Sequence, residues 1–218
     1  MSRVPRILLT VALLFGVMPN YAFAQDTHEM VNQEMSKPVI RGGIVFKTYC
    51  VVCHGERGDG VARAAKLYSG LNLSIKPRSS EYYAKIIRQG GERVGASGFM
   101  PPWQDELSNE QIGDVVAFLK VIGDPVRRGE VVFKANCVLC HGVRADGMGR
   151  AAKLFSPPPA SLMQSDKTDE YKERIIRLGG ESLQRSSGMP AWSERLSNKE
   201  IADVVRYLRT IVTVPPAH

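Results

Sequence analysis

Residues 50–54 read Cys-Val-Val-Cys-His, and residues 137–141 read Cys-Val-Leu-Cys-His. These two runs contain all four cysteines of the 218-residue chain. The sequence around the runs also repeats. Residues 42–47 match 129–134, and residues 63–67 match 150–154, both 87 positions later. Beyond the loop that follows, the offset grows to 89, which indicates a two-residue insertion in the second copy. The chain is therefore predicted to contain two tandem domains, at 39–123 and 124–214.

The C-x-x-C-H spacing is typical of covalent attachment of a c-type haem. Two thiols form thioethers with the vinyl groups, and the adjacent histidine binds the iron. We therefore predict two covalent haem c groups, with iron ligands His54 and His141 and with thioethers from Cys50, Cys53, Cys137 and Cys140. Zinc binding is the first alternative, but the cysteine pairs lack finger-like spacing. Two disulfides in an exported protein are the second.

The helical periodicity in each copy predicts an all-α fold. A helix should lead into each motif, and another should cover 81–89 and 169–178, each stopped by two glycines. The last helix of each copy should begin at a capping box, Ser108 with Gln111 and Ser197 with Glu200. Behind these caps, apolar residues recur at helical spacing and should form the core: Ile112, Val115, Val116, Leu119 and Ile122, then Ile201, Val204, Val205, Leu208 and Ile211.

A six-coordinate iron needs a second axial ligand, usually histidine or methionine. The two remaining histidines, His28 and His218, do not occupy matched positions in the repeat. Met100 and Met189 do, and each precedes a proline that stiffens its loop. We therefore predict Met100 and Met189 as iron ligands, the alternative being that they only pack the core.

Two further methionines, Met148 and Met163, have no counterpart in the first copy and are interpreted as packing residues.

The N-terminus predicts export. Arg3 and Arg6 precede an apolar run, and Ala-Phe-Ala at 22–24 is typical of a signal-peptide cleavage site. We expect a signal peptide at 1–24, a flexible leader at 25–38 and a periplasmic mature protein without a membrane span; retention of the apolar run as an anchor is the alternative. The net charge is +7, and removing Arg3 and Arg6 leaves +5. The propionates of two haems would offset much of this charge, so it is poor evidence for nucleic-acid binding.

The whole region 40–213 resembles two tandem class I cytochrome c domains, and in size and plan it is similar to the two-haem c-four type. The resemblance rests on both Cys-x-x-Cys-His-Gly runs, the Met-Pro loops, the Asp-Gly pairs at 59–60 and 146–147, and the Ser-Asn starts of the last helices. It implies that a glycine and an aromatic residue of the first helix cross an aromatic residue of the last: Gly42, Phe46 and Phe118, then Gly129, Phe133 and Tyr207.

The resemblance also implies that a proline carbonyl accepts the Nδ1 proton of the haem histidine. Pro158 or Pro159 fits that place in the second copy, and Pro77 in the first. Trp103 and Trp192 could line the haem pocket, bind a propionate or simply pack the core. Arg57 and Arg144 could pair with propionates or be exposed.

His/Met coordination leaves no open position on the iron, which favours an electron carrier that is not itself an enzyme. We expect single-electron transfer from a periplasmic dehydrogenase or membrane oxidoreductase to a terminal oxidase or reductase. The alternatives are a haem-bearing subunit of a larger dehydrogenase, or a two-haem oxidoreductase such as a thiosulfate dehydrogenase or a peroxidase.

Overall fold

The computed structural model describes residues 28–62, 64, 72–74 and 77–213. Over these residues the chain forms helices joined by turns and loops, and no β-strand occurs among them. After a helical stretch at 28–35, the elements are α2 (Pro38–Tyr49), α3 (Val51–His54), α4 (Ser80–Gln89), η2 (Glu92–Val94), α5 (Asn109–Leu119), α6 (Pro125–Asn136), α7 (Val138–His141), η3 (Ala152–Leu154), η4 (Leu162–Gln164), α8 (Asp169–Leu178), η5 (Glu181–Leu183) and α9 (Asn198–Ile211). The all-α prediction is confirmed.

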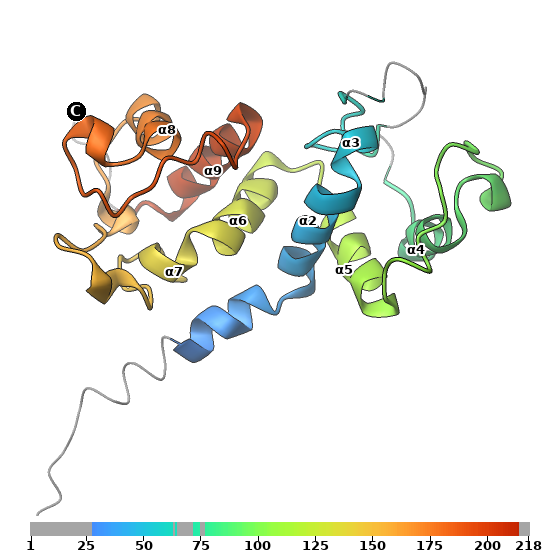
Figure 1. The fold of residues 1–218 in the computed structure, drawn as a ribbon, viewed down its shortest axis with the longest axis horizontal. Coiled ribbons are helices and arrows are strands. Elements are labelled where there is room, and N and C mark those ends of the chain that lie inside the picture. The colour runs from blue at the N-terminus through green and yellow to red at the C-terminus, as the bar shows by residue number, and fades with distance from the viewer. Residues whose placement is uncertain (1–27, 63, 65–71, 75–76, 214–218) are drawn as a thin grey trace, which may run out of the picture.

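Each half of the chain is built on two crossed helices, α2 with α5 and α6 with α9 (Figure 1). The backbones approach closely at a glycine. A Cβ added to Gly42 would collide with the carbonyl oxygen of Asp114, and one added to Gly129 would collide with that of Asp203. The two glycines that the resemblance singled out therefore set the depth of both helix crossings.

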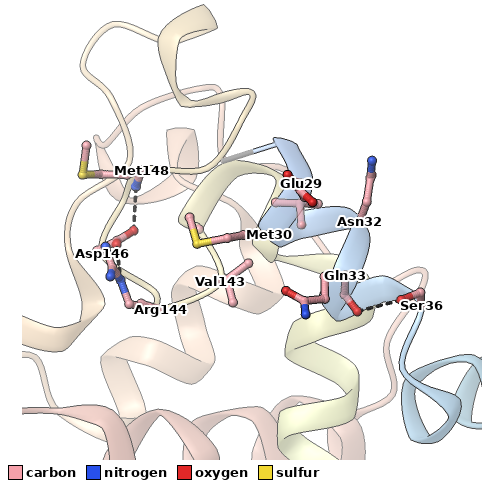
Figure 2. A pocket seen from close by; sticks show the side chains of 11 residues that line it. Glu29, Met30, Asn32, Gln33, Ser36, Val143, Arg144, Asp146 and Met148 are labelled. Atoms are coloured by element: carbon pink, nitrogen blue, oxygen red, sulfur yellow. Dashed lines mark hydrogen bonds and ion pairs between the residues drawn. The ribbon is translucent and has the colours of Figure 1, made fainter. Parts of the chain in front are cut away.

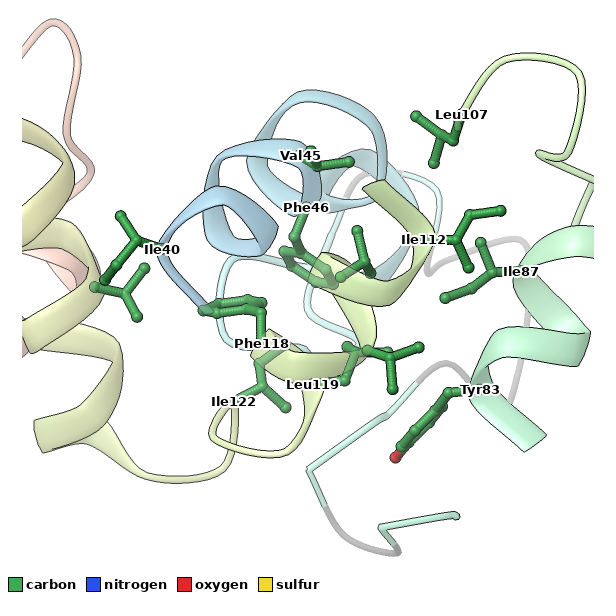
Figure 3. Close-up of a cluster of buried hydrophobic side chains, with 13 residues drawn as sticks. Ile40, Val45, Phe46, Tyr83, Ile87, Leu107, Ile112, Phe118, Leu119 and Ile122 are labelled. Atoms are coloured by element: carbon green, nitrogen blue, oxygen red, sulfur yellow. The ribbon is translucent and has the colours of Figure 1, made fainter. Parts of the chain in front are cut away.

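Aromatic pairs fill the space beside each crossing, as expected. Phe46 and Phe118 have ring centroids 5.3 Å apart, and Phe133 and Tyr207 have centroids 5.5 Å apart. The predicted stripes of the last helices are buried around them, except for the half-buried Ile211 at the end of α9. Figure 3 shows the first of the two cores, in which side chains from α2, α4 and α5 converge.

The predicted caps of the last helices are also confirmed. The Ser108 hydroxyl accepts a hydrogen bond from Gln111 N–H, and the Gln111 side chain accepts one from Ser108 N–H. Ser197 and Glu200 form the same reciprocal pair at α9. Such a cap satisfies two backbone donors that a helix start otherwise leaves unpaired.

The helices α4 and α8 occupy the ranges expected from the sequence. Each ends at the first glycine of a pair, Gly90 with φ 79° and Gly179 with φ 81°, a backbone conformation that favours glycine. The second glycine of each pair has another role, described below with the methionine loops.

The leader differs from expectation. Residues 28–35 are helical, Val31 is buried in the second core and Met35 contacts both cores. Glu34 lies 3.6 Å from the ammonium of Lys134 on α6. This segment, predicted to be flexible, therefore packs mainly on the second domain, and Met35 also reaches the first. Val31 is its single buried residue, which explains why no helical period was visible in the sequence.

The expected signal peptide at 1–24 and the histidine at 218 lie outside the described residues. Within the described part of the chain, every helix is too short or too polar to cross a membrane.

Candidate haem sites

Each Cys-x-x-Cys-His run forms a separate helical turn after a long helix. Cys50 ends α2 and begins α3, and Cys137 ends α6 and begins α7. The backbone N–H of His54 donates to Cys50 O, and that of His141 donates to Cys137 O, both at 2.9 Å. The turn thus places two thiols and an imidazole on one short segment.

A glycine ends this turn, and the chain then folds back on the histidine. Gly55 and Gly142 have φ of 76° and 79°, which reverses the chain direction. At the end of the loop that follows, the N–H of Gly60 donates to His54 O, and that of Gly147 donates to His141 O, both at 2.9 Å. We name residues 55–60 and 142–147 the first and second haem loops.

An aspartate shapes each haem loop. The Asp59 carboxylate accepts a hydrogen bond from Val61 N–H, and the Asp146 carboxylate accepts one from Met148 N–H, both at 3.0 Å. The Asp-Gly pairs that marked the resemblance are therefore turn-forming residues. Nothing in their spacing predicted this role.

Burial keeps several ionisable groups of the two motifs neutral. All four cysteines are free thiols. Burial, and to a smaller extent the neighbouring cysteine, raises the pKa of Cys50 and of Cys137 to about 12. Burial also lowers the pKa of His141, which favours the neutral imidazole that binds metal. Among the described residues, no group of three or more His, Cys, Asp or Glu side chains gathers as a metal site.

The histidine of the second motif lacks the partner that the resemblance implied. The Nδ1 atom of His141 is buried and accepts or donates no hydrogen bond. The carbonyl of Pro159 instead lies against Gly147, where it fills the space that a Cβ would take. The expected proline carbonyl contact is therefore absent from this arrangement of the loop.

The two methionine loops are seated on the glycine pairs. The N–H of Gly91 donates to Met100 O at 2.8 Å, and the N–H of Gly180 donates to Met189 O at 2.9 Å. A Cβ on either glycine would lie 3.2 Å from the Cβ of the same methionine. These glycines thus form a cradle for the methionine backbone, a role that the sequence did not reveal.

The far end of each methionine loop is pinned as well. The backbone N–H of Trp103 donates to Ile87 O at 2.9 Å, and the backbone N–H of Trp192 donates to Ile176 O at 3.0 Å. Trp103 packs edge-on against Tyr49, just before the first motif, with centroids 5.7 Å apart. Both methionines are half-buried and contact the core of their own domain.

The remaining candidates are not part of these arrangements. His28 is exposed in the leader helix, where its Nδ1 pairs with the Asn32 amide. Met163 lies in η4, and its carbonyl accepts hydrogen bonds from Thr213. Met148, expected to pack, is 52% exposed.

Comparison with known proteins identifies the family. The model for "Cytochrome C oxidase, cbb3-type, subunit III" matches residues 38–119 and again 124–208. The chain belongs to this cytochrome c family.

Similar proteins include components of two oxidases and of a dehydrogenase. The CcoP subunit of the cbb3-type cytochrome c oxidase of Rhodobacter capsulatus is 30% identical, and the match covers 78% of this chain and 61% of that protein. The FixP subunit from Sinorhizobium medicae is 25% identical, with 79% and 60% covered. One component of the nicotinate dehydrogenase of Pseudomonas putida is 26% identical over 74% of this chain, but over 17% of that protein. The chain thus spans about three fifths of the length of the oxidase subunits that it matches.

The residues present fit a haem c in each cytochrome domain. Two free thiols and a histidine share one turn. In the second domain the imidazole is half-buried, burial lowers its pKa, and its buried Nδ1 has no hydrogen-bond partner. These groups would supply the thioethers and one axial ligand.

Proposed function

We propose that this chain is an exported two-haem cytochrome that carries single electrons toward a terminal oxidase. Cys50, Cys53, Cys137 and Cys140 would form the thioethers, and His54 with Met100 and His141 with Met189 would be the axial ligands. The c-four-like plan of two similar domains, each with its own haem, is part of this proposal.

One observation carries it: a thiol-bearing turn and a cradled Met-Pro loop occur together in both domains, with matching backbone hydrogen bonds. When bound, the haem iron supplies reversible one-electron chemistry at a potential set by its axial ligands. The protein supplies rigidity. The glycine cradle and the backbone N–H of the tryptophan hold the two ends of each methionine loop. The loop should therefore move little when the charge of the iron changes.

Methionine variants test the axial ligands. The full chain is expressed in a strain that matures c-type cytochromes, and mass spectrometry should find the added mass of two haems. Met100→Ala and Met189→Ala should each abolish the long-wavelength sulfur-to-iron absorption of one haem, whereas the matched control Met163→Ala should leave both unchanged. Retention of the full band in both ligand variants would show that the assignment is wrong.

Export is tested on the same material. The mature N-terminus should be Gln25 in a periplasmic fraction, whereas an uncleaved N-terminus in the membrane fraction would favour the anchor alternative.

A second candidate is a haem-bearing subunit of a dehydrogenase, which the likeness to a nicotinate dehydrogenase component favours. Gentle purification from native membranes separates the two. A co-purifying oxidase supports the first proposal, and a co-purifying dehydrogenase supports the second.

A further inference from the structure

The first haem loop binds directly to the second domain. Glu56 accepts a hydrogen bond of 2.5 Å from the Ser197 hydroxyl, the cap of α9. Arg57 donates to Lys199 O and to the Asp203 carboxylate, both at 3.2 Å. We name this set of contacts the interdomain belt; its members are Lys47, Glu56, Arg57 and Asp59 in the first domain and Arg195, Ser197, Lys199, Glu200 and Asp203 in the second.

Two further ion pairs extend the belt. The Lys47 ammonium lies 2.7 Å from the Glu200 carboxylate and also donates to Arg195 O at 2.8 Å. The Lys199 ammonium lies 3.2 Å from the Asp59 carboxylate. Positive and negative groups thus alternate across the contact, so the attraction depends on one particular register of the two domains.

Asp203 is the buried centre of the belt. Its side chain is 3% exposed and is bound by three arginines: Arg128 at 2.8 Å, Arg206 at 2.9 Å and Arg57 at 3.2 Å. Arg128 and Arg206 belong to the second domain, and only Arg57 comes from the first. Removing Arg57 therefore leaves the buried carboxylate paired, and the second domain should still fold.

The repeat provides an internal control, because the second haem loop has no such contact among the described residues. Arg144, the counterpart of Arg57, has a side chain that is 70% exposed and pairs with Asp146 in its own loop. Val143 replaces Glu56. Lys134, the counterpart of Lys47, donates to Val143 O and lies beside Glu34 of the leader helix.

Figure 2 shows this second loop facing the leader helix. Both line a pocket with a volume of about 730 Å³. The haem-loop fold alone therefore does not require the belt.

An apolar contact lies beside the belt. Val131 of α6 packs into the first core, where its methyl group lies so close to Gly43 that an added Cβ would collide with it. Apolar contacts are not directional, whereas the ion pairs and hydrogen bonds of the belt favour one orientation of the two domains.

We propose that the interdomain belt fixes the orientation of the two domains, and that Glu56 and Arg57 are positioning residues for electron transfer between them. The inference rests on the proposed function, since it requires a haem in each domain. Because Glu56 and Arg57 follow His54 by two and three residues, the belt also ties the first axial imidazole to α9.

The test uses the full haem-loaded chain and the double variant Glu56→Val/Arg57→Ala, which gives the first loop the valine of the second. Small-angle scattering should show a larger maximum dimension, and flash photoreduction should show a severalfold slower equilibration between the haems. Arg144→Ala, at the matched position, should leave both quantities at their wild-type values. High salt, which screens the partly exposed pairs, should shift the wild type in the same direction as the double variant.

Lys47→Ala provides a second variant outside the haem loop, in case the double variant matures poorly. It removes two belt contacts and should also increase the maximum dimension. Unchanged scattering in both variants would overturn the proposal. Failure of the proposed function would be distinct, since it would appear as missing haem mass or missing sulfur-to-iron absorption in the wild type.

Discussion

The helix crossing at Gly42 should be the most sensitive point of the first domain. In Gly42→Ala, the new Cβ would meet the backbone carbonyl of Asp114, and its contact with Val115 N would be 2.9 Å. Backbone atoms cannot rotate away as a side chain can, so α2 and α5 must separate. That separation would open the packing of Phe46 on Phe118.

The expected magnitude follows from two opposing effects. Overpacking against rigid atoms costs about 3 kcal/mol. Replacing glycine by alanine within a helix recovers about 1 kcal/mol. The net loss of about 2 kcal/mol corresponds to a decrease of about 10 °C in the melting temperature of a domain this size.

Gly113→Ala is the matched control. Gly113 lies within α5, and a Cβ there would meet nothing within 4 Å. Only the gain in helix propensity remains, so this variant should be more stable by roughly 0.5–1 kcal/mol. Thermal and denaturant unfolding followed by circular dichroism would measure both. Equal stability of the two variants would refute the argument that the crossing depth depends on Gly42.

Three further predictions concern the caps, the belt and the leader. Ser108→Ala should cost about 1 kcal/mol in chemical unfolding, and Ser197→Ala should cost more, because that hydroxyl also bonds to the first haem loop; equal costs would contradict the second contact. Burial disfavours ionised Asp59, but hydrogen bonds from backbone N–H and from Lys199 outweigh it and hold its pKa below the usual value. The contact between Asp59 and Lys199 should therefore be intact at neutral pH and be lost as the pH falls through that lowered pKa, which should loosen the belt in scattering. Asp59→Asn should weaken this pH dependence without removing it, because the carboxylates of Glu56 and Glu200 also belong to the belt; an unchanged dependence in this variant would contradict the role of Asp59. Val31→Ala should destabilise only the second domain, by about 1–2 kcal/mol, and a change in the first unfolding transition instead would show that the leader packs elsewhere.

The helices could be predicted from the sequence because their signals are local, whereas their crossings were implied only by the resemblance to class I cytochromes c. A capping box and an apolar stripe lie within one segment, as at Ser108 and Ile112. The glycine cradle under each methionine could not be predicted, because Gly91 and Met100 meet only after the intervening loop has closed. The roles of Met100 and Met189 as ligands stay predictions.

The interdomain belt was beyond prediction for a different reason. Arg57 contacts Asp203 across 146 positions of sequence, and nothing local distinguishes it from Arg144. Both follow a haem histidine by three residues. The sequence offered two roles for these arginines, a propionate partner or an exposed side chain. Arg144 is exposed, whereas Arg57 binds the carboxylate of Asp203.

The two copies have diverged at the faces where the belt would otherwise repeat. In the belt, α9 contacts the first haem loop. If α5 of a second molecule contacted the second haem loop in the same way, Glu110 would take the place of Lys199 and face Asp146, and Ser108 would face Val143. Like charges in the first pair and a missing acceptor in the second would oppose that contact. Helix 28–35 already covers part of the same face. A head-to-tail contact between similar domains can continue from one molecule to the next unless the free ends differ. The substitutions at Glu110 and Val143 make these ends differ, so they oppose a second belt between molecules.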